Sequence, residues 1–212
     1  MFRIRIQNKK KCIWYCSAVV SFLLFLLLLG WTNHLANTQD AQQMAGRWSE
    51  KKDVAQISCF FSSKAEVTED TIQSFEYSLK NVLQEASITE TSENPSARLW
   101  VDAYSADGKI TLVNGKNTLD ANAIGIGGDF FMFHPLKLIT GAYFSGNDLM
   151  QDYCIIDQDA AWQLFGSNDV VGMTVYISNV PHIVTGVVQR PDSRMDKAAG
   201  LNSTVVYVSY GT

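Results

Sequence analysis

The sequence predicts an α+β domain that follows a single N-terminal membrane-spanning helix. One unbroken apolar block, residues 12–31, has the length that an α-helix needs to cross the hydrocarbon core of a bilayer. Beyond it, segments with the two-residue apolar period of β-strands are interspersed with helical patterns at residues 68–85 and 157–165. Strands and helices mixed in this way are typical of a mixed α/β domain of the α+β class.

The apolar block divides the charged residues unevenly. Five of the 17 Lys and Arg residues precede it, and all 21 acidic residues follow it. The part after the block therefore carries 12 basic and 21 acidic residues, a net charge of −9. A surface this acidic disfavours nucleic acid as a partner, because nucleic-acid binding depends on clustered Lys and Arg.

The flanks of the apolar block predict its orientation. Basic residues collect on the cytoplasmic side of membrane helices, so residues 1–11 are expected to be a cytoplasmic tail and the rest of the chain to lie outside. The alternative is a cleaved signal peptide, whose apolar region is usually shorter and is followed by an Ala-x-Ala-like site. The long block and the poor cleavage sites favour a retained, single-pass anchor in the plasma membrane, in contact with the lipid bilayer.

Residues 32–54 are predicted to form a polar stalk, and residues 55–212 to form the extracytoplasmic domain. The first strand of this domain is expected at residues 55–62. Thr68 is a suitable N-cap for a helix that ends near residue 85, because its hydroxyl can accept a free N–H of the first turn. Apolar residues at helical spacing predict that one face of this helix is buried; they are Ile72, Phe75, Leu79, Val82 and Leu83.

Further strands are expected at residues 98–105, 109–113 and 118–126. The dipeptide Asp107-Gly108 is favoured in two-residue hairpin turns and predicts a hairpin between the first two of these strands. Asn114-Gly115 predicts a second turn of the same kind. Near the C-terminus, residues 190–202 are charged and predict a loop, and residues 204–210 predict the last strand.

The stretch 141–188 carries the most local information. Residues 153–156 form a short apolar run bounded by polar residues, which predicts a strand. Asp157 follows where a helix N-cap belongs, and Gly166 stands where a glycine commonly ends a helix. Gly172 then precedes a strand at 173–177, and a turn at 178–181 leads to a third strand at 182–189.

Glycines, apolar residues and the capping aspartate recur at fixed spacing through this stretch. In order they are Gly141, Phe144, Ile155, Ile156, Asp157, Ala161, Leu164, Phe165, Gly166, Gly172, Val175, Ile177, Gly186, Val187 and Val188. This series resembles the MacB-like periplasmic core domain, the extracytoplasmic domain of FtsX/MacB-type ABC transporter permeases. The motif specifies a fold, so we expect structural roles for Gly141, Phe144, Asp157, Ala161, Leu164, Phe165, Gly166, Gly172 and Gly186.

The resemblance implies a non-catalytic permease component, the N-terminal part of an ABC transporter. It implies a separate cytoplasmic ABC ATPase and further permease transmembrane segments as partners, with the outer domain coupling ATP-driven motion to cargo or to an extracytoplasmic partner. The family normally adds three more membrane helices after this domain. Residues 32–212 hold no second apolar block, which leaves open a free-standing, membrane-anchored binding or sensor module.

No motif for catalysis, a cofactor or a metal emerges. The dinucleotide fingerprint that begins at Gly125 fails at Phe130, and the phosphate-loop spacing around Lys116 fails at Ile110 and Asn117. The three histidines share no metal-ligand spacing. For Cys59 and Cys154, both expected on strands outside the cytoplasm, a disulfide and two reduced thiols are alternatives.

Overall fold

The computed structural model describes residues 2–38, 44–48, 54–89, 98–146, 148, 150–190 and 203–212. The chain divides into two compact units, Met1–Lys52 and Asp53–Thr212.

The first unit contains helices α1 (Phe2–Thr38) and α2 (Met44–Trp48). Within the described part of the chain, Lys11–Leu35 is the one helical stretch long and apolar enough to cross a bilayer. It includes the expected span at 12–31. Because α1 continues to Thr38, the first residues of the expected stalk are helical. The division of the chain into a tail (1–11), a membrane span (12–31), a stalk (32–54) and an outer domain (55–212) stays a prediction.

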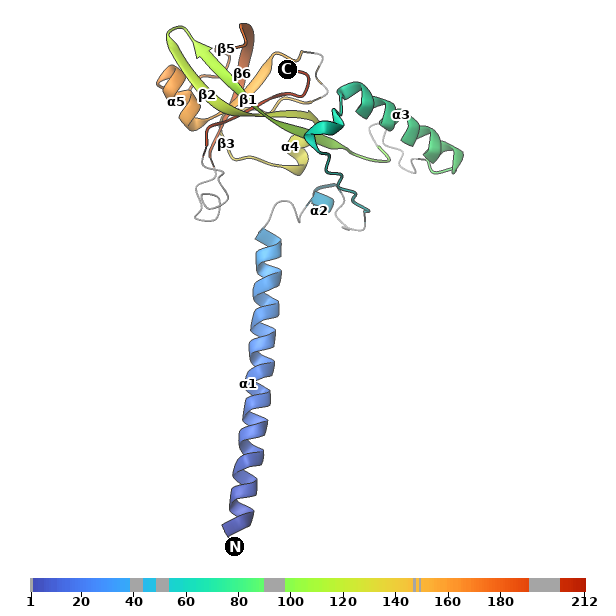
Figure 1. The fold of residues 1–212 in the computed structure, drawn as a ribbon, viewed down its shortest axis with the longest axis vertical. Coiled ribbons are helices and arrows are strands. Elements are labelled where there is room, and N and C mark those ends of the chain that lie inside the picture. Colours follow the sequence, from blue (N-terminus) through green and yellow to red (C-terminus); the bar gives the residue numbers. More distant parts are fainter. Residues whose placement is uncertain are drawn as a thin grey trace. The chain divides into compact units, whose positions relative to one another are not determined.

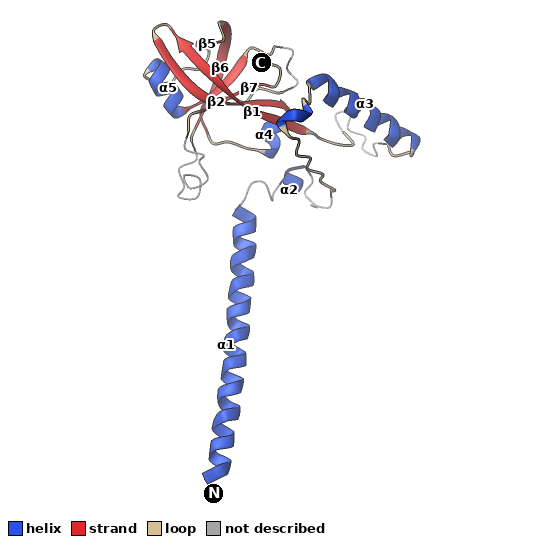
Figure 2. Cartoon of the chain, in the orientation of Figure 1, coloured by secondary structure: helices blue, strands red, loops and turns tan. Residues whose placement is uncertain are grey.

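The second unit contains one mixed sheet of seven strands (Figures 1 and 2). The strands are β1 (Ala103–Asn114), β2 (Asn117–Gly128), β3 (Leu138–Gly141), β4 (Tyr153–Asp157), β5 (Thr174–Ile177), β6 (Val180–Val188) and β7 (Val205–Ser209). Their order is β3-β6-β4-β7-β2-β1-β5, and β5 also pairs with β6. That additional pairing closes six strands into a ring, so the sheet is partly rolled into a barrel.

The last strand, β7, lies between β4 and β2. It is parallel to β2 and antiparallel to β4. The pair β4–β6 is also parallel, and the remaining pairs are antiparallel. Mixed pairing of this kind, with helices beside the sheet, confirms the predicted α+β class.

The longest hairpin shows one error of the sequence analysis. The turn expected at Asp107-Gly108 is absent, because β1 runs without interruption from Ala103 to Asn114 and pairs along its whole length with β2. The chain reverses instead just after Asn114, where Gly115 has φ +60°, as the second turn signal predicted. A full ladder of cross-strand bonds outweighs the local turn preference of Asp-Gly.

Two predictions for the start of the outer domain are also wrong. Residues 54–62 form no strand, and Phe60 is 94% exposed. Helix α3 (Glu69–Glu85) does form, with the Thr68 hydroxyl accepting from the N–H of Thr71 at 3.3 Å, but none of its residues is buried. Apolar spacing identifies which face of a helix is apolar, and burial additionally requires another element to cover that face.

Two buried clusters lie on the opposite faces of the sheet. Side chains alternate along a strand, so Cys154 and Ile156 of β4 enter the cluster that also contains Leu164 of helix α5 (Gln158–Phe165). Ile155 enters the other cluster, beside Phe131 of helix α4 (Phe130–Phe133). Both faces are thus covered, which explains why β4 reads as a continuous apolar run.

Candidate functional site

The buried carboxylate of Asp157 is the centre of a polar network in the outer domain. Asp157 is 2% exposed and ends β4 directly before α5. One carboxylate oxygen, Oδ1, accepts from the N–H of Ala160 at 2.8 Å, which is the predicted N-cap bond. The other, Oδ2, accepts from Arg190 Nε at 3.0 Å, from Arg190 Nη2 at 2.6 Å and from the N–H of Val205 at 3.0 Å.

Arg190 extends this network across the sheet. Its Nη2 also donates to the Thr204 hydroxyl at 3.1 Å, and its Nη1 lies 2.7 Å from a carboxylate oxygen of Asp159. Arg190, two residues after the end of β6, and Val205, the first residue of β7, are therefore held by one buried carboxylate at the end of β4. The cap is predictable from the sequence, whereas the ion pair is not, because nothing local links Asp157 to a residue 33 positions later.

Two glycines of the motif lie in a closely packed part of the sheet. Gly141 and Gly186 face each other in the β3–β6 pair. Gly141 has φ +83°, and a Cβ there would lie 2.1 Å from the carbonyl oxygen of Thr185. A Cβ on Gly186 would lie 3.0 Å from the carbonyl oxygen of Ala142. Only glycine fits at Gly141.

The other two motif glycines are required by backbone conformation alone. Gly166 ends α5 with φ +74°, as predicted, and its N–H bonds to the carbonyl oxygen of Trp162 at 2.9 Å. Gly172 precedes β5 with φ +82°. Neither would bring a Cβ within 4 Å of another atom.

The apolar motif residues are divided between the two clusters. Phe144 is 7% exposed and packs edge-on against Phe131, with ring centroids 5.7 Å apart. Ala161 and Leu164 are buried in the cluster beneath α5. Phe165 is only half-buried and packs at the margin of that cluster, so Leu164 is the main anchor of α5.

Cys59 and Cys154 form no disulfide in the structure. Both are free thiols: Cys59 is exposed, and Cys154 is fully buried in the core with its Sγ shielded from solvent. Burial raises the pKa of the Cys154 thiol to about 12, so it stays protonated and unreactive at neutral pH. Of the two alternatives, the structure has the reduced thiols.

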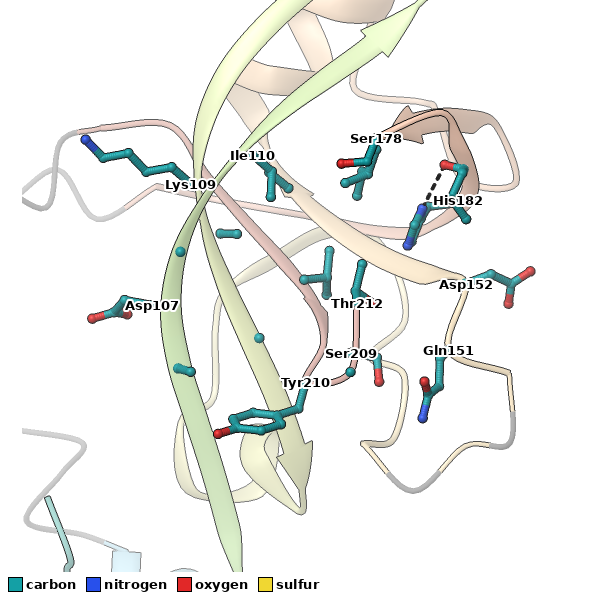
Figure 3. Close-up of a pocket in the computed structure, with 18 residues that line it drawn as sticks. Asp107, Lys109, Ile110, Gln151, Asp152, Ser178, His182, Ser209, Tyr210 and Thr212 are labelled. Carbon is teal, nitrogen blue, oxygen red and sulfur yellow. Dashed lines mark hydrogen bonds between the residues drawn. The ribbon is translucent and has the colours of Figure 1, made fainter. Parts of the chain in front are cut away.

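A groove of about 700 Å³ opens beside β1 (Figure 3). Its walls come from the middle of β1 and β2, the turn between β5 and β6, the start of β6, the residues before β4 and the chain from the end of β7 onward. The lining mixes polar residues with apolar and small ones, among them Ala106, Gly108, Ile110, Ala123, Ile177, Val180 and Val208. The side chains of Asp107 and Lys109 point away from the groove, whereas that of Ile110 points into it (Figure 3).

Two polar side chains of the groove have partners within the chain. His182 is 2% exposed, and its Nδ1 is 3.1 Å from the carbonyl oxygen of Val180. Tyr210 uses its hydroxyl to donate to the carbonyl oxygen of Val67 at 2.8 Å. Within the described ranges, no group of three or more His, Cys, Asp or Glu side chains lies close enough together to hold a metal ion. The groove is suited to contact with another apolar segment.

Comparison with known proteins gives a consistent family. The family model described as MacB-like periplasmic core domain matches residues 20–212. The chain is 32% identical over 96 residues to the macrolide export ATP-binding/permease protein MacB of Chromobacterium violaceum, which covers 44% of this chain and 14% of that protein. It is 29% identical over 97 residues to the protein of the same name from Pasteurella multocida, covering 45% and 14%. The chain thus spans about a seventh of the length of these curated relatives.

Two solved structures are similar over half of the chain. The periplasmic region of MacB from Actinobacillus actinomycetemcomitans superposes with a TM-score of 0.42 and 26% identity, covering 55% of this chain and 52% of that one. The extracellular domain of the ABC-type transporter YknZ from Gram-positive bacteria gives a TM-score of 0.42 and 22% identity, covering 51% and 54%.

Proposed function

This chain belongs to the family of MacB-like periplasmic core domains, and from that membership we propose that it acts as the N-terminal part of an ABC transporter permease. In this proposal the chain is non-catalytic. A separate cytoplasmic ABC ATPase supplies the energy, further transmembrane segments complete the permease, and the outer domain couples the resulting motion to cargo or to an extracytoplasmic partner.

The observation that carries the proposal is the family match over residues 20–212, which includes most of the apolar helix as well as the outer domain. The curated relatives in that comparison are described as ATP-binding/permease proteins. Their matched region is a small part of their length, so the parts of those proteins outside it are the source we propose for ATP hydrolysis.

The orientation of the helix belongs to the same proposal. The five basic residues within positions 3–11 favour a cytoplasmic N-terminus, and an extracytoplasmic location of residues 55–212 then follows from a single crossing. Basic residues this close to the membrane are also attracted by anionic lipids of the cytoplasmic leaflet.

Its architecture suits a part that transmits motion. The two buried clusters and the Asp157 network tie β4, β6, β7 and α5 together, so this part of the outer domain is expected to move as one body. A body of this kind can pass a displacement of its anchor to a partner without changing its own internal packing.

The proposal is tested by co-purification. The full chain is expressed in membranes with the ATPase and permease segments encoded beside its gene, extracted in mild detergent and isolated through a C-terminal tag. We expect the ATPase to co-purify and ATP hydrolysis to appear only in that complex. The chain alone is expected to show no saturable ATP binding and no phosphate release.

A matched variant sharpens this test. In this variant all five basic residues of the tail are replaced by Ala: Arg3, Arg5, Lys9, Lys10 and Lys11. It distinguishes a tail that contributes to binding of the ATPase or permease segments from a tail that only contacts anionic lipids. Saturable ATP binding by the isolated chain would overturn the permease proposal. Failure to recover any ATPase or permease segment would favour the membrane-anchored binding or sensor module.

A further inference from the structure

The outer edge of β1 is open along most of its length. On one side β1 pairs with β2 through all twelve residue pairs from Ala103 to Asn114. On the other side its pairing with β5 is limited to Leu112 and Val113. No strand among the described residues pairs with positions 103–111 on that side. In an antiparallel strand about half of the backbone N–H and C=O groups point to each side, so a row of them faces outward here.

The turn that follows β5 explains why the edge is open. Ser178 and Asn179 have φ of +49° and +67°, and they reverse the chain directly after Ile177. The chain therefore leaves β1 where Leu112 pairs with Ile177, and it continues as β6 on another path. The ring of strands is therefore closed at Leu112 and Val113 of β1 and open along residues 103–111.

The groove lies beside this open edge, over one face of the sheet. Ala106, Gly108 and Ile110 belong to the same face of β1 and line it, together with Ala123 and Gly125 of β2, which pair with Gly108 and Ala106. The side chains of Asp107 and Lys109 point away from it (Figure 3). A strand added to the open edge would therefore place alternate side chains over this groove.

A segment with the matching pattern lies elsewhere in the same unit. Residues 54–62, here called the strap, read Val-Ala-Gln-Ile-Ser-Cys-Phe-Phe-Ser. One alternating set of positions is entirely apolar: Ala55, Ile57, Cys59 and Phe61. The other set is mostly polar: Val54, Gln56, Ser58, Phe60 and Ser62. This is the pattern of a half-buried strand, yet Ile57 is 87% exposed and Phe61 is 67% exposed.

The strap is tethered close to the groove. The Tyr210 hydroxyl, on a residue that lines the groove, donates to the carbonyl oxygen of Val67 at 2.8 Å. Ser62 precedes Val67 by five residues, a length of chain that reaches at most roughly 17 Å. Tyr210 also packs edge-on against Tyr104, near the start of β1, with ring centroids 5.1 Å apart. The end of the strap is thus held near the start of the open edge.

We propose that the strap adds to the open edge of β1 as an eighth strand, with Ala55, Ile57, Cys59 and Phe61 directed into the groove. The occupant is the strap of the same chain, because the tether at Val67 gives it a high effective concentration at this edge. The structure shows the strap undocked. Asp107 and Lys109 on the outer face of β1 keep the open edge soluble in that state.

Docking would connect the membrane helix to the sheet. The strap directly follows the unit Met1–Lys52, which contains α1, so backbone bonds from the strap to β1 would join the anchor to the rigid part of the outer domain. This role as a coupling device rests on the proposed function, whereas the docking itself does not. Strand addition to a free edge is a common means of such contacts in proteins.

The test is hydrogen exchange on the full chain in detergent, with Ile57→Asp and Ser58→Asp as a matched pair. Both substitutions add one carboxylate to the strap, but only Ile57→Asp places it in the apolar set. We expect the β1 amides of residues 105–111 to exchange about tenfold more slowly in the native chain and in Ser58→Asp than in Ile57→Asp. Amides of β4 and β6 serve as the internal control and should be equally protected in all three.

Each other outcome overturns the proposal. Equal exchange of the β1 amides in all three proteins would mean that the strap does not dock. Protection that rises with protein concentration would assign the edge to a second copy, and protection that appears only after a co-purifying protein is added would assign it to a partner. Loss of protection in β4 and β6 as well would mean that Ile57 supports the whole fold. These results do not depend on recovery of an ATPase, so the strap and the transporter role can fail separately.

Discussion

Two regions of the outer domain, residues 153–188 and residues 54–89, differ in the burial of their apolar residues. In residues 153–188, Ile155, Ile156 and Val187 are fully buried. In residues 54–89, Ile57 and Phe60 of the strap are largely exposed, as is Phe75 of α3. Both regions carry clear apolar periodicity, so periodicity alone does not separate them. The difference is that strands and α5 cover each other in the first region, whereas in the described part of the second region no residue of α3 is buried and the apolar residues of the strap stay exposed.

The comparison shows what converts an amphipathic pattern into a core. In the buried region a small number of long-range polar bonds hold the elements in place, foremost those of Asp157 to Arg190 and Val205. In the other region two long-range contacts involve the segment: the bond of Tyr210 to Val67, and the hydrogen bond between the side chains of Glu76 and Asp102.

The largest loss of stability is expected for Asp157→Ala. The change removes the cap of α5, the acceptor of the Val205 N–H and the partner of a guanidinium that is itself mostly buried. Breaking a buried ion pair from one side costs about 3–5 kcal/mol of unfolding free energy. Chemical unfolding of the full chain in detergent measures it. Asp159→Ala is the control: its side chain is 46% exposed, so loss of its ion pair should cost below about 1 kcal/mol.

Truncation of α5 should rank next and should distinguish neighbouring residues. Leu164→Ala is expected to cost about 3 kcal/mol, because Leu164 is 1% exposed within the core. Phe165→Ala should cost less despite the larger side chain, since Phe165 lies at the margin of the same cluster. The pair is compared in the same unfolding assay. A larger loss for Phe165→Ala would mean that α5 packs through the other side.

Two motif glycines with nearly equal φ separate backbone strain from steric clash. Gly172→Ala introduces only strain, about 1 kcal/mol, because its Cβ meets open space. Gly141→Ala adds a clash with the carbonyl oxygen of Thr185 and should cost about 2 kcal/mol more. Equal losses of unfolding free energy would show that β3 moves away from β6 at no cost.

Truncation of a large apolar side chain should cost little stability in the exposed region, residues 54–89. Phe75→Ala on α3 removes a large aromatic ring that is 66% exposed, so the unfolding free energy should change by less than about 0.5 kcal/mol. This is the direct counterpart of Phe165→Ala. A loss comparable to that of Leu164→Ala would show that α3 is covered in solution.

The smallest expected effect concerns pH. Burial, the negative charge of Asp102 and a hydrogen bond with the Asp102 side chain raise the pKa of Glu76 above its ordinary value of 4.5. Because the folded-state pKa is raised, this contribution to stability is present below pH 4.5 and is lost as the pH rises through the raised pKa. Glu76→Gln should remove the dependence, which hydrogen exchange in α3 on either side of this range would detect. If the exchange rates of the α3 amides in the native chain, corrected for the intrinsic rate, do not change with pH across this range, the prediction is wrong.

The sequence predicts local structure well and long-range structure poorly. Asp157, Gly166 and Thr68 are recognised from their immediate neighbours, and all three cap helices as expected. The Asp107-Gly108 turn fails because its outcome depends on pairing with β2, and the buried face of α3 fails because burial depends on a covering element. Arg190 is missed for the same reason, since its partner lies 33 residues away and no local pattern marks the contact.

The place of β7 in the sheet has a consequence for synthesis on the ribosome. Val205–Ser209 is made after every other described strand, yet it is inserted between β4 and β2 rather than added at an edge. Until it emerges, the nascent chain has two unpaired strand edges in the centre of the future sheet, and the Asp157 carboxylate lacks the Val205 amide. Such edges invite pairing with other chains. The outer domain is therefore expected to depend on chaperones until translation reaches its final residues.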